Sequence, residues 1–266
     1  MTRSKISSLI LIVNLSFFLY YYYLLINFEL NRFTKVILFF AIAISQHYFL
    51  NLVHITSHKI ASSNKYLNSL IGFVASIFGG VTFADFQTTH MLHHQNTSNP
   101  TKDPDHFITT FGPIYLIPFK IFYHDVYFWT KSLWKKNRWI DYILVRVIQI
   151  AIVCGFYLTN NLNIWLHFWL VPVFLVGTLN GFFLFYFPHF TTMTEKKWRK
   201  QKNQNQIQKI FLTSIDISRT YHEDHHQNIK TFKNYFPIVG FIIDQIKKTP
   251  IRKYPHNLKY TDLEVN

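Results

Sequence analysis

The chain has 266 residues, of which 49% are hydrophobic, and it contains 28 Phe and 16 Tyr. The hydrophobic residues occur in long runs, which is typical of an integral membrane protein and excludes an ordinary water-soluble domain. The net charge of +14 would suit a nucleic-acid partner, but the lysines and arginines gather beside the apolar runs, as they do in membrane proteins. We therefore expect one membrane-embedded domain over residues 1–266, in contact with the lipid bilayer and without a nucleic-acid partner.

Four apolar segments are long enough to cross the hydrocarbon core as helices, which takes roughly 20 residues. They cover residues 7–28, 36–53, 140–158 and 164–187. The sequence therefore predicts an all-α integral membrane fold with about four transmembrane helices. Two further apolar stretches, 67–83 and 108–129, are interrupted by glycine, proline or charged residues, and we expect them to dip into the membrane or to lie on it.

The first apolar segment follows Arg3 and Lys5, which is also the pattern of a secretory signal peptide. It is longer than a signal core and no small-residue cleavage site follows it, so we expect it to remain as a span. Cys154 is the only cysteine and lies inside the third span. The sequence thus predicts neither a disulfide framework nor a thiolate metal site.

Eight of the 14 histidines form three clusters. Residues three and four apart share one face of a helix, so each cluster directs two or three imidazoles to a common point. Imidazoles without cysteine suit iron, zinc, copper or nickel. The eight histidines and the nearby His189 are too many for one ion, so two metal ions are predicted. The clusters are His54 with His58, His90 with His93 and His94, and His222 with His225 and His226.

Basic residues precede the third span and follow the fourth, whereas the connection at 159–163 has no charge. The positive-inside pattern places both basic segments on the cytoplasmic side. An inside N-terminus and two helical hairpins then bring the histidine-rich segments 54–106 and 189–230 to that same side. Arg32 and Lys35, in the outer connection of the first hairpin, fit this pattern less well.

A histidine that binds a metal needs its second ring nitrogen held by a carboxylate or a carbonyl. The sequence alone does not choose among the nearby carboxylates, which are Asp103, Asp105, Asp125, Asp216, Glu223 and Asp224. His106 and His124 are candidates for ligands or for such supporting groups. We expect His47, His167 and His256 to be structural.

The histidine clusters resemble the three boxes of the membrane fatty-acid-desaturase-like superfamily of di-iron enzymes. Within that superfamily, residues 96–107, 122–125 and 133–136 are similar to carotenoid ring hydroxylases of the cyanobacterial β-carotene 3-hydroxylase type. The resemblance implies four membrane helices, two iron ions beneath a cytoplasmic cap, and O2 as co-substrate. The iron ligands that it implies are His54, His58, His90, His93, His94, His189, His222, His225 and His226.

Three positions depart from the hydroxylase pattern. Ile55 follows the first histidine where that group usually has an acidic residue, and Phe185 stands where the group tends to carry an aspartate. Gln227 begins a segment that replaces a frequent Leu-Trp-Pro. These departures concern the substrate more than the metals. The preferred activity is hydroxylation of the ionone ring of a carotenoid, and the alternatives are acyl-lipid or fatty-acid desaturation and carotenoid ketolation.

The third cluster also contains His222-Glu223-x-x-His226, the pattern of zinc proteases, in which the glutamate activates a zinc-bound water. A protease needs only one further ligand and leaves the His90 cluster unused. A membrane metal carrier is another alternative, but carriers place their ligands along a path through their helices. We therefore favour an oxidase.

Electrons for dioxygen chemistry must come from an external donor, because the chain has no Gly-x-Gly-x-x-Gly dinucleotide fingerprint. The hypothesis is a small acidic carrier such as ferredoxin. It would dock through complementary charge on the basic clusters near Lys135 and Lys197. The substrate is expected to be apolar and dissolved in the membrane, such as a carotenoid or an acyl lipid.

Overall fold

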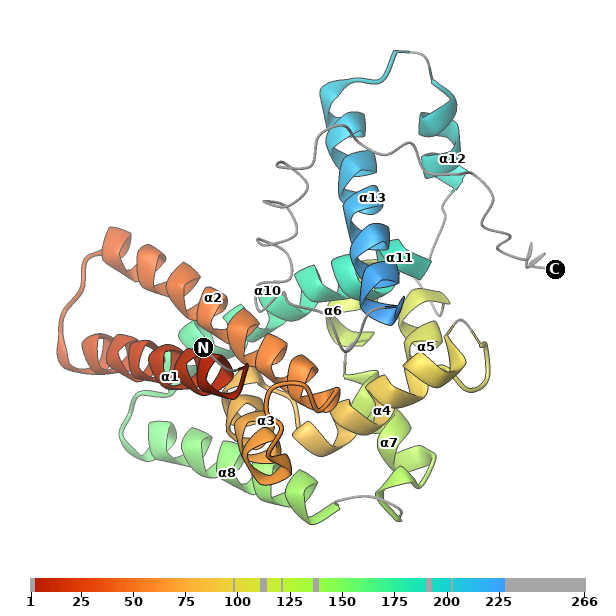
Figure 1. The fold of residues 1–266 in the computed structure, drawn as a ribbon. Helices are drawn as coiled ribbons and strands as arrows, with labels where there is room; N and C mark the ends of the chain where they lie inside the picture. Colours follow the sequence, from red (N-terminus) through yellow and green to blue (C-terminus); the bar gives the residue numbers. More distant parts are fainter. Residues whose placement is uncertain are drawn as a thin grey trace.

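The computed structural model describes residues 3–97, 99–110, 114–120, 122–135, 139–189, 193–201 and 203–227. Within these ranges every regular element is a helix, as Figure 1 shows. Four helical stretches are long and apolar enough to cross a membrane: Ser4–Asn27, Arg32–Ser57, Trp139–Leu158 and Leu162–His189. The predicted all-α fold with four membrane helices is therefore confirmed.

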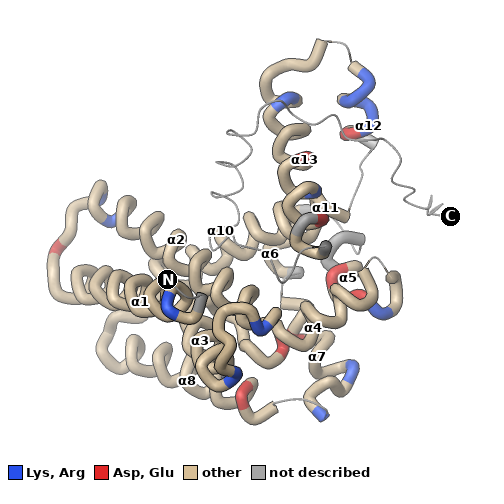
Figure 2. The backbone as a smooth tube through the Cα atoms, viewed as in Figure 1, with Lys and Arg blue, Asp and Glu red and all other residues tan. Residues whose placement is uncertain are grey.

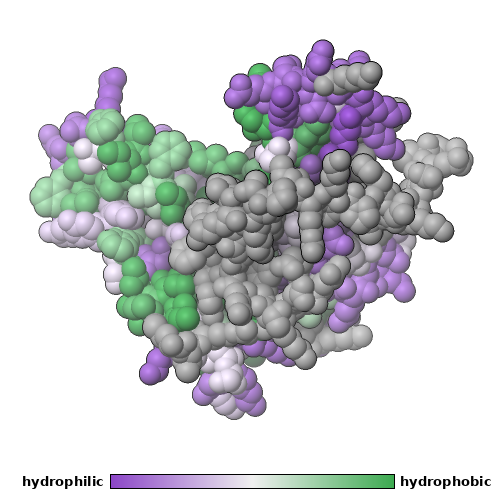
Figure 3. All heavy atoms as spheres, turned by 45° about the horizontal axis from the view of Figure 1, so that its top comes forward, coloured by the Kyte–Doolittle hydropathy of each residue, from purple (hydrophilic) through white to green (hydrophobic). Residues whose placement is uncertain are grey.

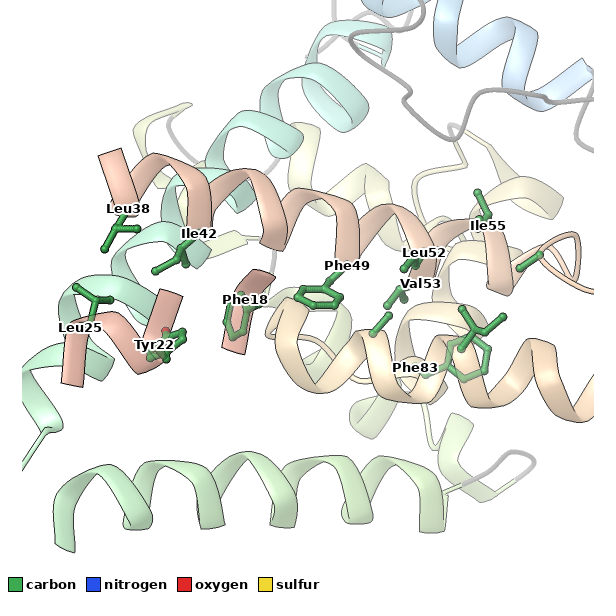
Figure 4. Packing of buried hydrophobic residues seen from close by; sticks show 13 residues of the cluster. Phe18, Tyr22, Leu25, Leu38, Ile42, Phe49, Leu52, Val53, Ile55 and Phe83 are labelled. Atoms are coloured by element: carbon green, nitrogen blue, oxygen red, sulfur yellow. The ribbon is translucent and has the colours of Figure 1, made fainter. Parts of the chain in front are cut away.

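Helices α1 (Arg3–Asn27) and α2 (Arg32–Ser57) form the first hairpin. Asn31 starts α2 because its side chain accepts a hydrogen bond from the Thr34 N–H at 2.9 Å. Phe18 and Tyr22 of α1 pack toward α2, where Phe49 meets Phe18 edge to face (Figure 4). The opposite face of α1 is left apolar and exposed, as a lipid-facing surface requires.

Helix α2 continues one turn beyond the predicted end of its span, so that His54 lies on the helix and His58 caps its end. The hydroxyls of Thr56 and Ser57 donate to carbonyls one turn earlier, at 2.7 and 2.8 Å, which lets these polar residues remain helical. The helix ends where Lys59 adopts a positive φ of 59°. The helix thus continues beyond the apolar span, and it carries His54 toward the histidine clusters.

Helices α3 (Lys65–Gly79) and α4 (Phe83–Asn96) meet at an angle of 104°, which makes a broken span or a re-entrant loop. Gly80 turns the chain with a φ of +79°, a conformation that favours glycine. Thr82 then caps α4 by accepting from the Asp85 N–H. The bend accounts for the apolar but glycine-interrupted stretch at 67–83, and it directs α4 and its histidines away from α3.

Helix α8 (Trp139–Leu158) is the third span, and the fourth consists of α9 (Leu162–Trp165), α10 (Val171–Asn180) and α11 (Phe187–His189). Two wider π-helical segments, 166–170 and 181–186, join the parts of the fourth span. Pro172 has no N–H to give to the preceding turn, which agrees with the wider turn before it. Such π segments occur frequently at functional sites.

The connections α1–α2 and α8–α9 lie at one end of the bundle, on the left of Figure 1, and α4 and α13 (Gln206–Gln227) lie toward the other. Between them in sequence are the short helices α5 (Pro104–Thr110), α6 (Ile117–Lys120), α7 (Tyr123–Thr130) and α12 (Met193–Lys200). Figure 3 shows hydrophobic atoms over the α1–α2 side and hydrophilic atoms around α12. The two-hairpin arrangement that the sequence predicts therefore matches the structure.

Candidate metal centre

A first group of imidazoles converges from α2, α4 and α13. His54, His58, His90 and His225 each offer one ring nitrogen, and these nitrogens lie within 4.8 Å of one another. The Nε2 atom of His58 is 2.8 Å from that of His90 and 3.1 Å from that of His225. Two nitrogens bound at right angles to one metal at about 2.1 Å would lie about 3.0 Å apart. The spacing therefore suits nitrogens that share one ion.

A second group lies beside the first. His93, His222 and His226 have ring nitrogens within 4.8 Å of one another, and the Nε2 atoms of His93 and His226 are 3.2 Å apart. The ring of His189, at the end of the fourth span, is centred 4.4 Å from the ring of His222. Together these four histidines could hold a second ion.

His94 lies between the two groups. Its Nε2 atom is 3.2 Å from that of His90 and 3.0 Å from that of His225, while its ring centre is 4.0 Å from that of His226. The structure thus brings together all nine histidines that the resemblance implied, from α2, α4, α11 and α13.

The electrostatics of His58 and His226 suit metal binding. Burial, followed by the neighbouring His54 ring, lowers the pKa of His58 to about 3. Burial, followed by His93, lowers the pKa of His226 to about 4. Both rings are therefore neutral at pH 7, and a metal binds the neutral imidazole. The Nε2 atoms of His189 and His222 are buried and have no hydrogen-bond partner in the described chain, which an ion would provide. The donor set fits two transition-metal ions.

Two of the candidate carboxylates hold His93 from behind. Its Nδ1 atom is 2.9 Å from Asp103 Oδ1 and 3.3 Å from Asp105 Oδ2. Asp105 also reaches His124, whose Nε2 atom lies 3.3 Å from its Oδ1. The Nδ1 atom of His124 in turn lies 3.0 Å from the Thr89 hydroxyl. His124 therefore belongs to the supporting network. Thr89 could not be found from the sequence, because its partner is 35 residues away.

Asp125 pairs with Arg146, the basic residue of the third span. The Arg146 guanidinium donates to both carboxylate oxygens at 2.7 and 2.8 Å, and the Tyr142 hydroxyl donates at 2.8 Å. Arg146 also donates to Gln149, which donates to carbonyls around the bend between α3 and α4. This network ties α7 and α8 to the bend and explains how the third span tolerates a charge.

A second ion-pair network holds α13 in place. Glu195 of α12 is buried and accepts hydrogen bonds from the Arg219 guanidinium at 2.7 and 3.0 Å and from Arg199 at 2.8 Å. Arg219 also donates to the carbonyl of Phe187, two residues before His189. Burial opposes the charge of Glu195, but the two guanidiniums outweigh it and lower its pKa. We refer to Glu195, Arg199 and Arg219 as the α12–α13 clamp.

The remaining candidates lie elsewhere. Asp216 pairs with Arg199 at 2.6 Å and not with a histidine. His167 is bonded to the Asn163 carbonyl of its own helix at 2.8 Å, in agreement with a structural role. The side chain of Asp224 and all of His256 lie outside the described residues. Glu223 stays a candidate supporting carboxylate, and His106 stays a candidate ligand or supporting group, as expected from the sequence.

A cavity of about 110 Å³ opens onto the metal centre. Its walls come from α2 and α10, where Leu50 and Val173 are among the apolar residues, and from Leu184 and Phe185 of the following turn. His47, for which a structural role was expected, lines it too. Five of the clustered histidines reach the cavity, namely His54, His90, His93, His222 and His225.

Four apolar helices and a polyhistidine site that could hold metal ions are the features of a membrane protein with a candidate metal centre. Residues 32–231 match the family model described as fatty acid desaturase, and the chain belongs to this family of membrane oxidoreductases. This match confirms the predicted resemblance to the desaturase-like superfamily. It does not test the resemblance to the carotenoid hydroxylase subgroup.

One curated relative is a Delta 8-(E)-sphingolipid desaturase from Kluyveromyces lactis. It is 28% identical over 100 residues, which are 37% of this chain and 16% of the relative. The match thus spans less than a fifth of the relative's length. No solved structure matches the chain.

Proposed function

We propose that this protein is a di-iron, O2-dependent membrane oxidase that attacks an unactivated C–H bond of an apolar, membrane-dissolved substrate. The observation that carries the proposal is the convergence of nine imidazoles beside a largely apolar cavity. Bound irons would supply the reduction of dioxygen and the abstraction of hydrogen. The first ion would be held by His54, His58, His90 and His225, the second by His93, His189, His222 and His226, and His94 would stand between them.

The chain's own residues prepare this chemistry. Asp103 accepts the Nδ1–H of His93, which leaves the Nε2 lone pair directed at the second group. The α12–α13 clamp fixes the turn of α13 that carries His222. Leu50, Val173 and their apolar neighbours bind the substrate and exclude water from the reacting bond.

Hydroxylation of a carotenoid ring is the first candidate reaction. Its support is the position of the segments that resemble the ring hydroxylases. Asp103 and Asp105 of the first segment contact His93, and His124 of the second contacts Asp105. The resemblance therefore lies at the metal centre and not on a remote surface.

Desaturation of a lipid chain is the second candidate, favoured by the similarity to a sphingolipid desaturase over 100 residues. Both reactions begin with the abstraction of hydrogen; rebound of a hydroxyl gives an alcohol, and a second abstraction gives a double bond. We do not propose a zinc protease, because His222 and His226 stand among seven further histidines that a single-zinc site would leave without a role. We do not propose a metal carrier, because the histidines gather at one place.

We further propose that residues 1–266 form one domain, that the histidine clusters face the cytoplasm, and that a ferredoxin-like protein supplies electrons. Figure 2 shows basic residues on α12, and Lys196, Lys197 and Lys200 are exposed there. Lys131 and Lys135 follow α7, which lies far from α12 in that view, so one small carrier would not cover both clusters. We place the donor on α12 because this helix is bonded to α13.

The donor site is tested by charge reversal. Replacing Lys196, Lys197 and Lys200 by Glu should slow reduction by an acidic carrier at least about 10-fold at low salt, with a smaller loss at high salt. The matched control reverses Lys131 and Lys135. Unchanged reduction rates in the α12 variant would contradict the assignment.

The reaction is tested in a host that accumulates β-carotene, with pigments and total lipids analysed by chromatography and mass spectrometry beside a His93→Ala control. Added oxygen on the pigment with retained hydrogen count supports ring hydroxylation, and a carbonyl product supports ketolation. New double bonds in lipid chains with unchanged pigment support desaturation. An iron-loaded protein that changes neither pool, in the presence of a reducing partner, would refute the oxidase.

A further inference from the structure

The cavity beside the metal centre reaches the protein surface at one aromatic residue. Of the described residues that line it, Phe122 is the most exposed, at 36%, while the others are buried or half-buried. Phe122 directly precedes α7 and caps its start. A residue that borders both the cavity and the outside marks a place where a ligand can pass between them. The cavity therefore opens beside the first turn of α7.

At the bend between α3 and α4 the cavity wall is closed. Gly79 and Gly80 line the cavity there. A Cβ atom added to Gly80 would lie 3.0 Å from Val173 Cγ1, and one added to Gly79 would lie 3.3 Å from Leu50 Cδ2. Contacts between carbon atoms are favourable only at somewhat longer distances, so a hydrocarbon chain cannot pass between the bend and helices α2 and α10.

The opening at Phe122 lies near the middle of the membrane-spanning region. Phe119 and Phe122 both pack against Phe174 of α10, with ring centres 5.8 and 5.4 Å from it. Phe174 stands 12 residues after the start of the fourth span at Leu162 and 15 residues before its end at His189. Helix α6, which carries Phe119, lies beside α10 in Figure 1. At this depth an exposed side chain faces lipid chains and not water.

The surface around the opening is apolar. Phe119 and Val126, three residues before and four residues after Phe122, are 62% and 51% exposed. Trp129 and Lys131 follow at the end of α7, and both are exposed. Tryptophan favours the membrane–water interface, and a lysine near the end of a membrane helix extends its charge to that level. Helix α7 therefore leads from an opening in the lipid region to the membrane surface.

Aromatic rings alone stand across the opening. The ring of Phe122 meets that of Phe174 edge to face, at an angle of 60° between their planes. Exposed side chains change rotamers within nanoseconds. A rotation of the Phe122 ring can therefore widen the opening without movement of a helix.

We propose that the hydrocarbon chain of the substrate enters the cavity sideways from the bilayer, between α7 and α10, and that Phe122 and Phe174 form the gate of this portal. The occupant is a hydrocarbon chain dissolved in the membrane, because a polar group would lose its hydrogen bonds among Phe119 and Val126. This inference rests on the proposed function only in assigning the cavity to the substrate. It adds the route by which the substrate arrives.

The test uses the full-length, metal-free protein in phosphatidylcholine nanodiscs. The probe is hexadecane with a diazirine in the middle of its chain, which stays in the bilayer and forms covalent adducts when it is illuminated. Mass spectrometry should find adducts on Asp85 and Tyr221, which are buried and line the cavity, and on Ile150, which is exposed on α8. The ratio of the inner adducts to the adduct on Ile150 measures access to the cavity.

The decisive comparison closes the gate. Phe122→Cys and Phe174→Cys are combined with Cys154→Ser, and the two new thiols are bridged in detergent by a short bis-methanethiosulfonate. The bridge should lower the ratio at least about 10-fold, and its cleavage by a reductant should restore the ratio. The matched control combines Val126→Cys with Cys154→Ser and receives the same reagent. It should keep the wild-type ratio, because Val126 is not among the described residues that line the cavity.

A second variant tests the gate without a bridge. Phe122→Ala should raise the ratio about 3-fold after a brief exposure to the probe, whereas Val126→Ala should leave it unchanged. An unchanged ratio in the bridged protein would overturn the portal, as would an unchanged ratio in Phe122→Ala, or adducts on Ile150 with none on Asp85 and Tyr221. Gel filtration and circular dichroism identify any variant that fails to fold. Because neither iron nor turnover is involved, failure of the oxidase proposal in the pigment and lipid assay would not alter this result.

Discussion

Helices α2 and α8 are both apolar enough to cross a membrane, but they differ in how much of their surface is buried in the protein. Half of the apolar window of α2 is buried, against 6% of that of α8. Helix α2 turns Gln46, His47, Asn51 and His54 inward, whereas α8 presents Val147 and Ile150 outward and buries only Val145. Hydropathy thus identifies a span, and the polar residues on its inner face indicate whether the span carries function.

The largest loss of turnover is expected for the buried histidines that face the interior of the bundle. His222→Ala or His225→Ala should reduce turnover below about 1% and should reduce the amount of iron bound. Each substitution removes one nitrogen ligand from a preformed group of histidines. Turnover and iron per protein are the measurements. His167→Ala, on an exposed residue of the fourth span, is the control and should stay active. A fully active His225→Ala variant would remove that residue from the ligand set.

The next largest effect, a weaker affinity for metal, is expected for a carboxylate that holds one of the histidines. Asp103→Asn should weaken metal binding about 10- to 100-fold, since His93 loses the charged acceptor at its Nδ1 atom. Iron retention during titration with a chelator measures this loss. Asp216→Asn, which removes a carboxylate bonded to Arg199 and not to a histidine, should leave retention unchanged. Equal retention in both variants would show that Asp103 does not support the centre.

A moderate effect is expected from the α12–α13 clamp. Glu195→Gln removes the buried charge that binds two guanidiniums, and should destabilise the packing of α13 by about 2–3 kcal/mol. The loss is limited to this size because Arg219 is partly exposed and can be hydrated. Hydrogen exchange of α13 amides measures the change. Exchange should accelerate in α13 and stay unchanged in α1, and uniform exchange across both would contradict a local role.

The clamp should also respond to pH. The pKa of Glu195 is lowered in the folded protein, so its stabilisation is fully present above the unfolded value of about 4.3 and is lost as pH falls below it. As pH falls from about 4.3 toward 3, thermal unfolding of the wild type should therefore lose more stability than that of Glu195→Gln, all else being equal. Parallel pH profiles would show that the carboxylate carries no net stabilisation.

The smallest effect is expected on the lipid-facing side. Ile150→Leu, at a residue that is 61% exposed, should change stability by less than about 0.5 kcal/mol. Ile42→Ala, at a residue that is fully buried in α2, should cost about 2–4 kcal/mol. Unfolding in mixed micelles compares the two. Similar losses would show that the outer face of α8 is covered by protein and not by lipid.

The membrane spans and the convergence of the histidines could be predicted from the sequence, because both depend on local patterns. Long apolar runs fix membrane helices, and spacings of three and four residues place imidazoles on one helix face. The second box is the clearest example: His90, His93 and His94 lie on α4 and point into the two groups as expected.

The parts that the sequence missed depend on residues far apart in the chain. Thr89 meets His124 across 35 residues, and Arg219 meets Glu195 across 24. His47 was expected to be structural because it lies within a span, and its place in the cavity wall could not be predicted from the sequence. Such contacts follow from how the helices cross, which neither composition nor periodicity specifies.

The wide π-helical segment at 181–186 sets the angular phase of the fourth span. Asn180 and His189 are nine residues apart, which is two and a half turns of an ideal α-helix and would place them on opposite faces. Both nevertheless face the same interior, Asn180 at the cavity and His189 against the ring of His222. The segment works as a rotational spacer, so deleting a single residue within it would turn His189 away from the metals while leaving the hydropathy of the span intact.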